Sequence, residues 1–151
     1  MVAAAGNNFA GLPVRSIVYP ARMRRVVAAC GVMADFSPYF DLAPDTMQGC
    51  YGPDRKMDTA LSGFTPNIPW PLFGCGSAVR ENGEGTSSAT PQIAAAAALW
   101  IARHMEALDA LPDAWMRGEA VRQALFRSAR MPTGGEKATL GAGAISAMRM
   151  L

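Results

Sequence analysis

The sequence predicts a globular unit of the α/β class, in which helices flank a parallel sheet. The chain has 151 residues, half of them hydrophobic and 17% charged, which is enough apolar mass for a core and excludes a disordered chain. Two short apolar runs, residues 2–5 and 25–32, end in polar or glycine-containing segments, as buried strands of parallel sheets do. Two later segments, residues 92–108 and 112–130, are rich in helix-forming residues.

The first apolar run is followed directly by Gly6, Asn7 and Asn8, which predicts a strand that ends in a turn. A long stretch, residues 37–85, separates the second run from the first helix and is dense in Pro, Gly, Asn and Asp, with aromatic residues interspersed. We interpret this stretch as packed surface loops. Loops of that length inside a compact domain are uncommon unless they bind or gate something.

Two helices are predicted in the second half of the chain. Thr90 and Pro91 match an N-cap followed by proline in the first turn, which predicts a helix over residues 92–108. Five consecutive alanines make the first half of this helix apolar on every side, so we expect it in the middle of the protein. The helix over residues 112–130 should lie on the surface with one buried face, and residues 141–148 form a short closing element.

The charges and the cysteines exclude several classes of function. Fourteen basic and twelve acidic residues give a net charge of +2, and the basic residues are scattered apart from a cluster at Arg22, Arg24 and Arg25. No nucleic-acid partner or anionic membrane is therefore predicted. Three cysteines at wide spacings match neither a zinc site nor a disulfide framework. The apolar stretch after Pro91 meets Arg103 too soon to cross a bilayer.

A turn of small residues before the first long helix carries the candidate catalytic residue. Ser87 would lie at a helix N-terminus, where unpaired N–H groups and the positive end of the helix dipole stabilise an oxygen that becomes anionic. Gly85 and Ala89 are small enough to let a substrate carbonyl approach. In isolation the same residues would predict only a capped helix, because Ser and Thr are preferred N-cap residues.

Residues 85–94, Gly-Thr-Ser-Ser-Ala-Thr-Pro-Gln-Ile-Ala, resemble the nucleophile motif of the subtilisin-like serine proteases, Gly-Thr-Ser-Met-Ala-Thr-Pro-His-Val-Ala. Other landmarks of that family occur in the family's order. Residues 2–7, Val-Ala-Ala-Ala-Gly-Asn, are similar to the strand and turn that carry its oxyanion-hole asparagine, and Tyr-Pro-Ala at residues 19–21 is similar to the turn before its next core strand. Residues 140–147 resemble the Gly-x-Gly-x-x-x-Ala segment that closes many of these domains. The resemblance covers most of the chain, with residues 37–84 the least matched.

The resemblance implies a doubly wound, mostly parallel sheet flanked by helices, of which this chain would be an incomplete, C-terminal portion. It implies a serine endopeptidase in which Ser87 attacks the peptide carbonyl, while the Asn7 side-chain amide joins the Ser87 N–H in holding the oxyanion. In subtilisin, loss of such an asparagine lowers turnover by ~10²–10³-fold. By itself Asn7 would also fit an asparagine in a left-handed turn. Residues 37–84 and a wall of small residues would border the polypeptide substrate, the wall being Ala3, Ala4, Ala5 and Gly6.

The chain departs from the family pattern at three positions of the motif. Ser88, Gln92 and Ala95 stand where the family usually has Met, His and Gly, and none of the three touches the acyl chemistry directly. A larger departure concerns the acid and the base. In this family the catalytic Asp and His both lie upstream of the oxyanion Asn, and here a single residue precedes the strand that leads to Asn7.

No residue of the chain is predicted to act as the general base. The only histidine, His104, lies seventeen positions after Ser87, which is about 25 Å along a helix. Lys56 and Lys137 would be candidates for a Ser-Lys dyad, but loop lysines are mostly solvated and no motif places either beside the serine. We therefore expect the 151 residues to be the C-terminal part of a catalytic domain, inactive alone, with the missing N-terminal part of that domain as a partner. The strand over residues 2–5 and the apolar helix would then be exposed.

No cofactor and no metal are predicted, because the acidic residues between positions 35 and 58 form no recognisable calcium loop. Two other functions remain open. A non-catalytic structural or interaction module built on the same fold would account for the missing base. An α/β-hydrolase esterase would need Gly-x-Ser-x-Gly around its serine, and Ala89 stands where the second Gly would be.

Overall fold

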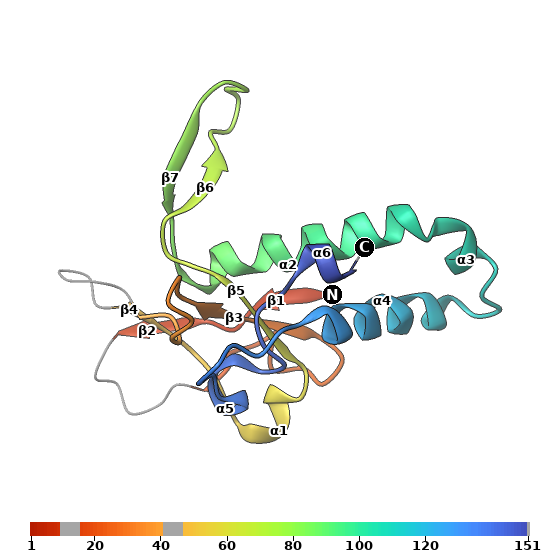
Figure 1. The fold of residues 1–151 in the computed structure, drawn as a ribbon, viewed down its shortest axis with the longest axis horizontal. Coiled ribbons are helices and arrows are strands. Elements are labelled where there is room, and N and C mark those ends of the chain that lie inside the picture. Colours follow the sequence, from red (N-terminus) through yellow and green to blue (C-terminus); the bar gives the residue numbers. More distant parts are fainter. Residues whose placement is uncertain (10–15, 41–46, 151) are drawn as a thin grey trace.

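Three parallel strands form the central sheet of the computed structural model, which describes residues 1–9, 16–40 and 47–150. The strands are hydrogen-bonded in the order β1-β3-β5 (Figure 1), and their bounds are Val2–Ala4 for β1, Val27–Val32 for β3 and Ala60–Phe64 for β5. Both strands expected from the apolar runs are present and run parallel to each other. The predicted α/β class is therefore confirmed.

The middle strand, β3, is buried along its whole length because the sheet is covered on both faces. Its side chains alternate between two apolar clusters. Val27 and Ala29 lie on one face with Leu61 of β5, and Ala28 and Cys30 lie on the other. Burial on both faces explains why this strand has a continuous apolar pattern rather than an alternating one.

Helices cover the first face of the sheet: α2 (Gly85–Arg103), α4 (Ala114–Ser128) and α6 (Ala147–Met150). The short helix α3 (Met105–Asp109) follows α2 and packs against α2 and α4. α2 packs on the sheet through Ala89 and Ile93, and α4 lies beside α2 with Leu125 in the same cluster (Figure 1). The predicted second helix is thus present with slightly shorter bounds. In the described parts of the chain, none of the helices is long and apolar enough to cross a bilayer.

The first long helix begins earlier than its sequence predicts. The pattern places the N-cap at Thr90, but α2 starts at Gly85 and includes Pro91. The Thr90 hydroxyl donates to the carbonyl of Thr86 at 2.8 Å, so it bonds within the helix instead of capping it. The predicted boundary is wrong because a proline near a helix start looks like a first-turn proline in sequence.

An apolar surface beside β1 and α2 is exposed to solvent. Among the described residues β1 pairs with β3 alone, which leaves its second edge free. One side of α2 is exposed at Ala94, Ala95, Ala98 and Leu99, so in this chain the helix is not buried on every side. A cavity of about 540 Å³ lies between α2, α4 and Val2.

The second face of the sheet is covered by short helices and irregular segments. α1 (Asp54–Met57) contributes Met57 to a cluster with Ile17 and Ala21, and α5 (Lys137–Leu140) packs Leu140 against the end of β3. Helices therefore lie on both faces of the sheet, as a doubly wound arrangement requires.

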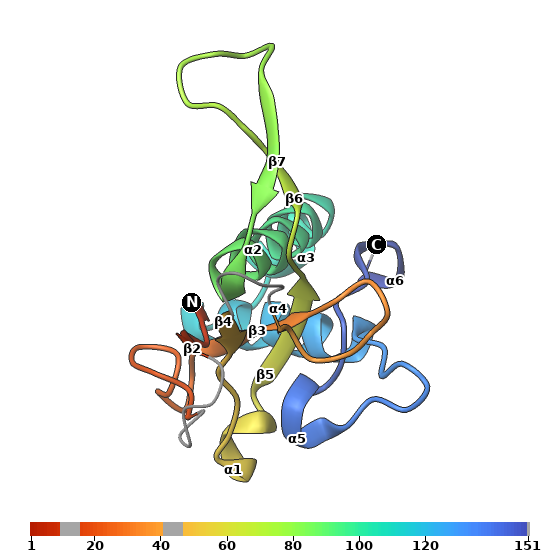
Figure 2. The same cartoon turned by 90° about the vertical axis from the view of Figure 1, so that its left-hand side faces the viewer.

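Residues 37–85 contain more regular structure than the predicted loops. They hold α1, β5 and three further strands, which are β4 (Met47–Gly49), β6 (Ile68–Pro71) and β7 (Val79–Gly83). β4 pairs antiparallel with β2 (Asn7–Phe9), and β6 and β7 form a hairpin that stands out from the body of the protein (Figures 1 and 2). The all-loop prediction is wrong here, although the part of it at residues 41–46 lies outside the described residues.

Candidate active site

The chain turns sharply where β1 ends, and this turn delivers Asn7. Gly6 has φ 103°, a left-handed conformation that L side chains rarely adopt. A Cβ on Gly6 would also come within 2.7 Å of the Val18 side chain, so a larger residue would force Val18 to shift. The small residues predicted as a substrate wall form this strand and turn: Ala3 and Ala4 are half-buried, Ala5 is buried and Gly6 is half-buried.

A second sharp turn, between β7 and α2, delivers Ser87. Gly85 has φ 72° and begins α2, which places Ser87 in the first helical turn. A Cβ on Gly85 would lie 2.7 Å from Nδ2 of Asn7, so glycine is required for the two turns to approach each other. Ser87 is exposed, whereas its neighbours Gly85 and Thr86 are buried. The turn after β1 lies at the carboxyl ends of the parallel strands, and the close approach of Gly85 to Asn7 places the second turn there too. Proteins of the α/β class commonly build their sites at this end of the sheet.

Two reciprocal hydrogen bonds join the two turns. The backbone N–H of Thr86 donates to Oδ1 of Asn7 at 2.9 Å, and the backbone N–H of Gly6 donates to Oγ1 of Thr86 at 3.1 Å. The first bond satisfies one of the N–H groups that a helix leaves unpaired in its first turn. Asn7 therefore caps α2 from a position 79 residues away. The N-cap residue of α2, Glu84, makes no side-chain capping bond of its own.

The bond to Thr86 also orients the Asn7 amide. Because Oδ1 accepts from the helix, the two N–H donors on Nδ2 point away from that acceptor, and Nδ2 lies against Gly85 at the turn that carries Ser87. The structure thus places Asn7 against Gly85 and Thr86, the two residues that precede Ser87. It also adds Thr86 to the site, which sequence reasoning treats as one of several capping candidates.

The structure shows what surrounds Gln92, Ser88 and Ala95, the three residues that depart from the family motif. Gln92 joins α2 to β5, because its Nε2 donates to the carbonyl of Phe64 at 2.8 Å and its Oε1 accepts from the Phe64 N–H at 3.1 Å. The Ser88 hydroxyl donates to the carbonyl of Glu84 at 3.0 Å, within the first turn of α2. Ala95 lies on the exposed side of the helix.

None of the other basic residues considered in the sequence lies beside Ser87. His104 ends α2, at the far end of the helix from Ser87, and its ring contacts that of Trp100 with a centroid separation of 4.7 Å. Lys56 is buried below the sheet, where its Nζ donates to backbone carbonyls, and Lys137 forms an exposed ion pair with Asp58. Within the described ranges, no three His, Cys, Asp or Glu side chains gather as a metal site.

The fold and the paired turns define the class of protein: an α/β chain that presents a serine at the start of a central helix beside a side-chain amide. The match to the family model named Subtilase family covers residues 1–143. The chain therefore belongs to the subtilase family, which is the family that its motifs resemble. No protein with a curated description matches it in sequence.

Solved structures similar to this chain include maturation proteases and a macrocyclase. The prenylagaramide maturation protease PagA is 19% identical with a TM-score of 0.73, over 99% of this chain and 48% of that one. The patellamide maturation protease PatA is 22% identical with a TM-score of 0.71, over 99% of this chain and 48% of that one. The PatG macrocyclase domain is 21% identical with a TM-score of 0.69, over 98% of this chain and 42% of that one. At these identities the likeness concerns the fold, and the chain spans about half the length of the structures it matches.

Proposed function

We propose that this chain carries the nucleophile and the oxyanion hole of a serine endopeptidase, with Ser87 as the nucleophile and Asn7 as the side-chain donor. The observation that carries the proposal is the pair of hydrogen bonds between Thr86 and the Gly6–Asn7 turn, at 2.9 and 3.1 Å. The first bond holds Asn7 through its acceptor, Oδ1, and the Nδ2 donors would then serve a ligand. A donor fixed before the reaction stabilises charge that develops only in the transition state.

The reaction would follow the acyl-enzyme route. Oγ of Ser87 attacks the peptide carbonyl carbon, its proton passes to a general base, and the carbonyl oxygen becomes an anion held by Nδ2 of Asn7 and the backbone N–H of Ser87. The proton then moves to the leaving amine as the C–N bond breaks, which leaves an ester on Ser87. Water hydrolyses that ester and restores the hydroxyl.

The general base and its orienting acid would come from polypeptide outside these 151 residues. His104, the only histidine, is at the opposite end of α2 from the serine. The free edge of β1 and the apolar cavity of about 540 Å³ between α2 and α4 are suited to a further strand and helix of the same domain. The 151-residue chain alone would then be inactive.

The substrate would be a polypeptide that lies along the wall of small residues, Ala3 to Gly6. Small side chains there leave the backbone accessible to an extended peptide, and residues 47–84 would supply part of the surrounding surface. A structure of the PatG macrocyclase is described as a complex with peptide, and it has 21% identity and a TM-score of 0.69 to this chain. That neighbour supports a peptide ligand for the fold.

The second candidate is a non-catalytic module built on the subtilase fold. The positions of His104, Lys56 and Lys137, each held away from Ser87, favour it. An esterase of the α/β-hydrolase type has less support, since Ala89 is buried against β5 where that motif would need glycine.

The proposal is tested by measuring peptide hydrolysis. The sample is a polypeptide that contains Ser87 together with the sequence upstream of Met1. Ser87→Ala should abolish hydrolysis, and the matched control Ser88→Ala should retain it, because the Ser88 hydroxyl bonds only within the first turn of α2. An upstream sequence without His and Asp, together with no hydrolysis, would establish the module instead.

A further inference from the structure

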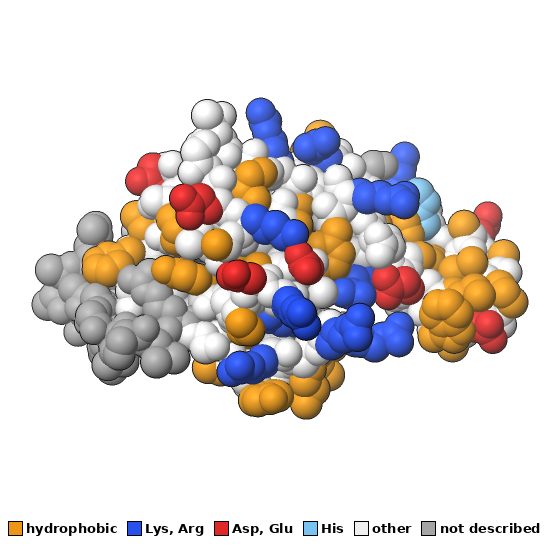
Figure 3. Space-filling model, turned by 90° about the horizontal axis from the view of Figure 1, so that it is seen from below, with side chains coloured by type: hydrophobic (Ala, Val, Ile, Leu, Met, Phe, Trp, Pro, Cys, Tyr) orange, Lys and Arg blue, Asp and Glu red, His pale blue; other side chains and the backbone are white. Residues whose placement is uncertain are grey.

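A basic groove lies on the side of the sheet opposite Ser87. It has a volume of about 950 Å³ and lies between the turn before β3, helix α1 and helix α4. Six basic side chains line it, and Figure 3 shows Lys and Arg gathered on this face: Arg22, Arg24, Arg25, Arg55, Lys56 and Arg122. Its walls come from segments that precede β3 and β5, so it opens at the amino edge of the sheet, away from the carboxyl edge that carries the proposed catalytic residues.

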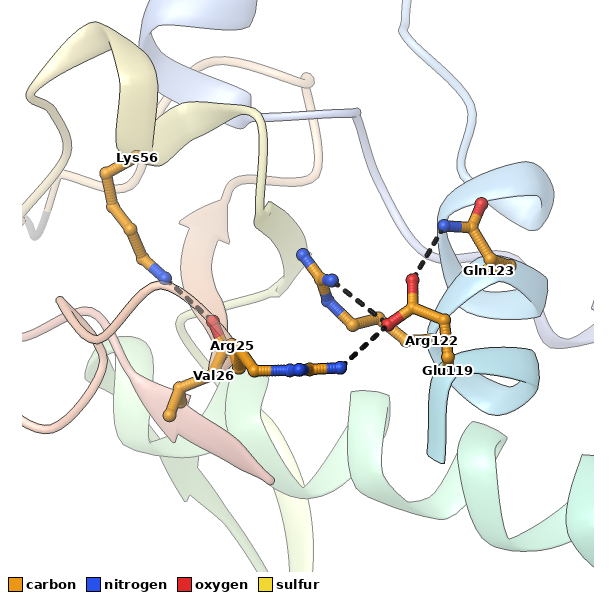
Figure 4. Close-up of polar contacts among 6 residues, drawn as sticks. All are labelled: Arg25, Val26, Lys56, Glu119, Arg122 and Gln123. Atoms are coloured by element: carbon orange, nitrogen blue, oxygen red, sulfur yellow. Dashed lines mark hydrogen bonds and ion pairs between the residues drawn. The ribbon is translucent and has the colours of Figure 1, made fainter. Parts of the chain in front are cut away.

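The positive charge of the groove is poorly compensated. Asp58 is the one acidic residue in the lining, and its carboxylate already pairs with Lys137. Glu119, beside the groove, is shared between Arg25 at 3.8 Å and Arg122 at 3.4 Å (Figure 4). Three more arginines are exposed and form no ion pair with any described residue: Arg22, Arg24 and Arg55.

The fold holds these charges together by means of a buried lysine. Lys56 is 6% exposed, and its Nζ donates to the carbonyls of Met23 at 2.9 Å and Val26 at 2.7 Å. The lysine thereby ties the turn that carries three arginines to helix α1. Desolvation lowers the pKa of Lys56, and the charge of Arg122 lowers it further, as expected where cations are crowded. An anion in the groove would relieve this repulsion.

We propose that the groove binds an acidic segment of polypeptide, rich in Asp or Glu. Its volume is suited to a ligand with several charged groups rather than to a single small oxyanion. The guanidinium group of arginine binds a carboxylate through two parallel hydrogen bonds, and most of the cations that line the groove are arginines. The lining contains no aromatic side chain on which a nucleic-acid base could stack, and a concave groove does not match the convex surface of a duplex. The inference does not depend on peptidase activity.

Fluorescence anisotropy with the 151-residue chain and labelled octaglutamate tests this proposal. Octaglutamate should bind, with an affinity that falls as salt increases, and octaglutamine should not. The triple variant R22E/R24E/R55E should bind octaglutamate at least about tenfold more weakly, since three unpaired cations become repulsive. The matched control R80E/R103E/R127E makes the same charge change at exposed arginines outside the groove, and it should bind within about twofold of the unmodified chain.

Three results would overturn the proposal: equal weakening in the two triple variants, equal binding of octaglutamine, or tighter binding and displacement by oligothymidylate or tripolyphosphate. The last result would assign the groove to phosphate-bearing ligands. Hydrogen exchange on the unmodified chain gives an answer even if a variant fails to fold. Octaglutamate should slow exchange in residues 22–26 and 53–59, and protection confined to other segments would contradict the groove as the site.

Discussion

The Asn7 side chain caps α2 through Oδ1 and is proposed to donate to the oxyanion through Nδ2. Two substitutions at this position should separate these roles. Asn7→Ala removes the acceptor for the Thr86 N–H, which leaves a donor in the first turn of α2 unpaired, and it also removes the Nδ2 donors. A lost helix cap costs ~1–2 kcal/mol of unfolding free energy. Asn7→Asp keeps an oxygen acceptor at a helix N-terminus, where negative charge is favourable, so its unfolding free energy should stay within about 1 kcal/mol of the original. Asp nevertheless lacks the donor that an oxyanion needs.

Urea unfolding of the 151-residue chain measures the first role, and peptide turnover by a longer polypeptide with the upstream segment measures the second. Turnover should fall by ~10²–10³-fold in both variants, in keeping with the loss known for this position in subtilisin. Asn82→Ala is the matched stability control, since Asn82 accepts one N–H, from Trp70 at 2.9 Å, in an exposed hairpin. Equal stability losses in Asn7→Ala and Asn82→Ala, or full turnover in Asn7→Asp, would refute this reasoning.

Two further predictions each compare a buried side chain with an exposed one of the same residue type, first two lysines and then two cysteines. Lys56→Met should lower the unfolding free energy by about 2–4 kcal/mol in urea titrations, because it leaves two backbone carbonyls without their charged donor. The control Lys137→Met breaks only an exposed ion pair and should cost less than about 1 kcal/mol, so an equal loss in both would contradict the role of Lys56. Iodoacetamide should modify Cys75 in the folded chain, with a midpoint below pH 9, because a hydrogen bond with Ser77 lowers the pKa of this exposed thiol. Cys30 is buried and burial raises its pKa to about 12, so mass spectrometry that finds it modified before unfolding would contradict the packing.

The strand β3 could be predicted from sequence because burial on both faces makes its residues continuously apolar. The strand β1 is only half-buried, but its run of Val and Ala ends at Gly6 and was readable in the same way. The strand β5 could not be predicted from sequence, because its residues are suited to contacts with residues that are distant in the chain. Ser62 is buried because its hydroxyl donates to the carbonyl of Leu140 at 3.0 Å, and Gly63 is needed because a Cβ there would lie 2.9 Å from the backbone of Ala89 in α2. A serine and a glycine next to each other look like a loop when these neighbours are unknown.

Ser87 and Asn7 could be chosen as candidates from sequence because each belongs to a motif of consecutive residues. The structure places Asn7 against Gly85 and Thr86, just before Ser87. The link through Thr86 joins residues 79 positions apart, so no local pattern reveals it. The basic groove was not predictable either, because the cluster at residues 22–25 gains its partners Arg55 and Arg122 only through folding.

The most direct test of the central claim is to map a fluorophosphonate adduct by tandem mass spectrometry. The sample is the polypeptide that contains these 151 residues and the sequence upstream of them. We expect a single adduct on Ser87, which should be lost in Ser87→Ala and kept in Ser88→Ala. An adduct on Ser88, or no adduct in a polypeptide whose upstream sequence supplies His and Asp, would contradict it.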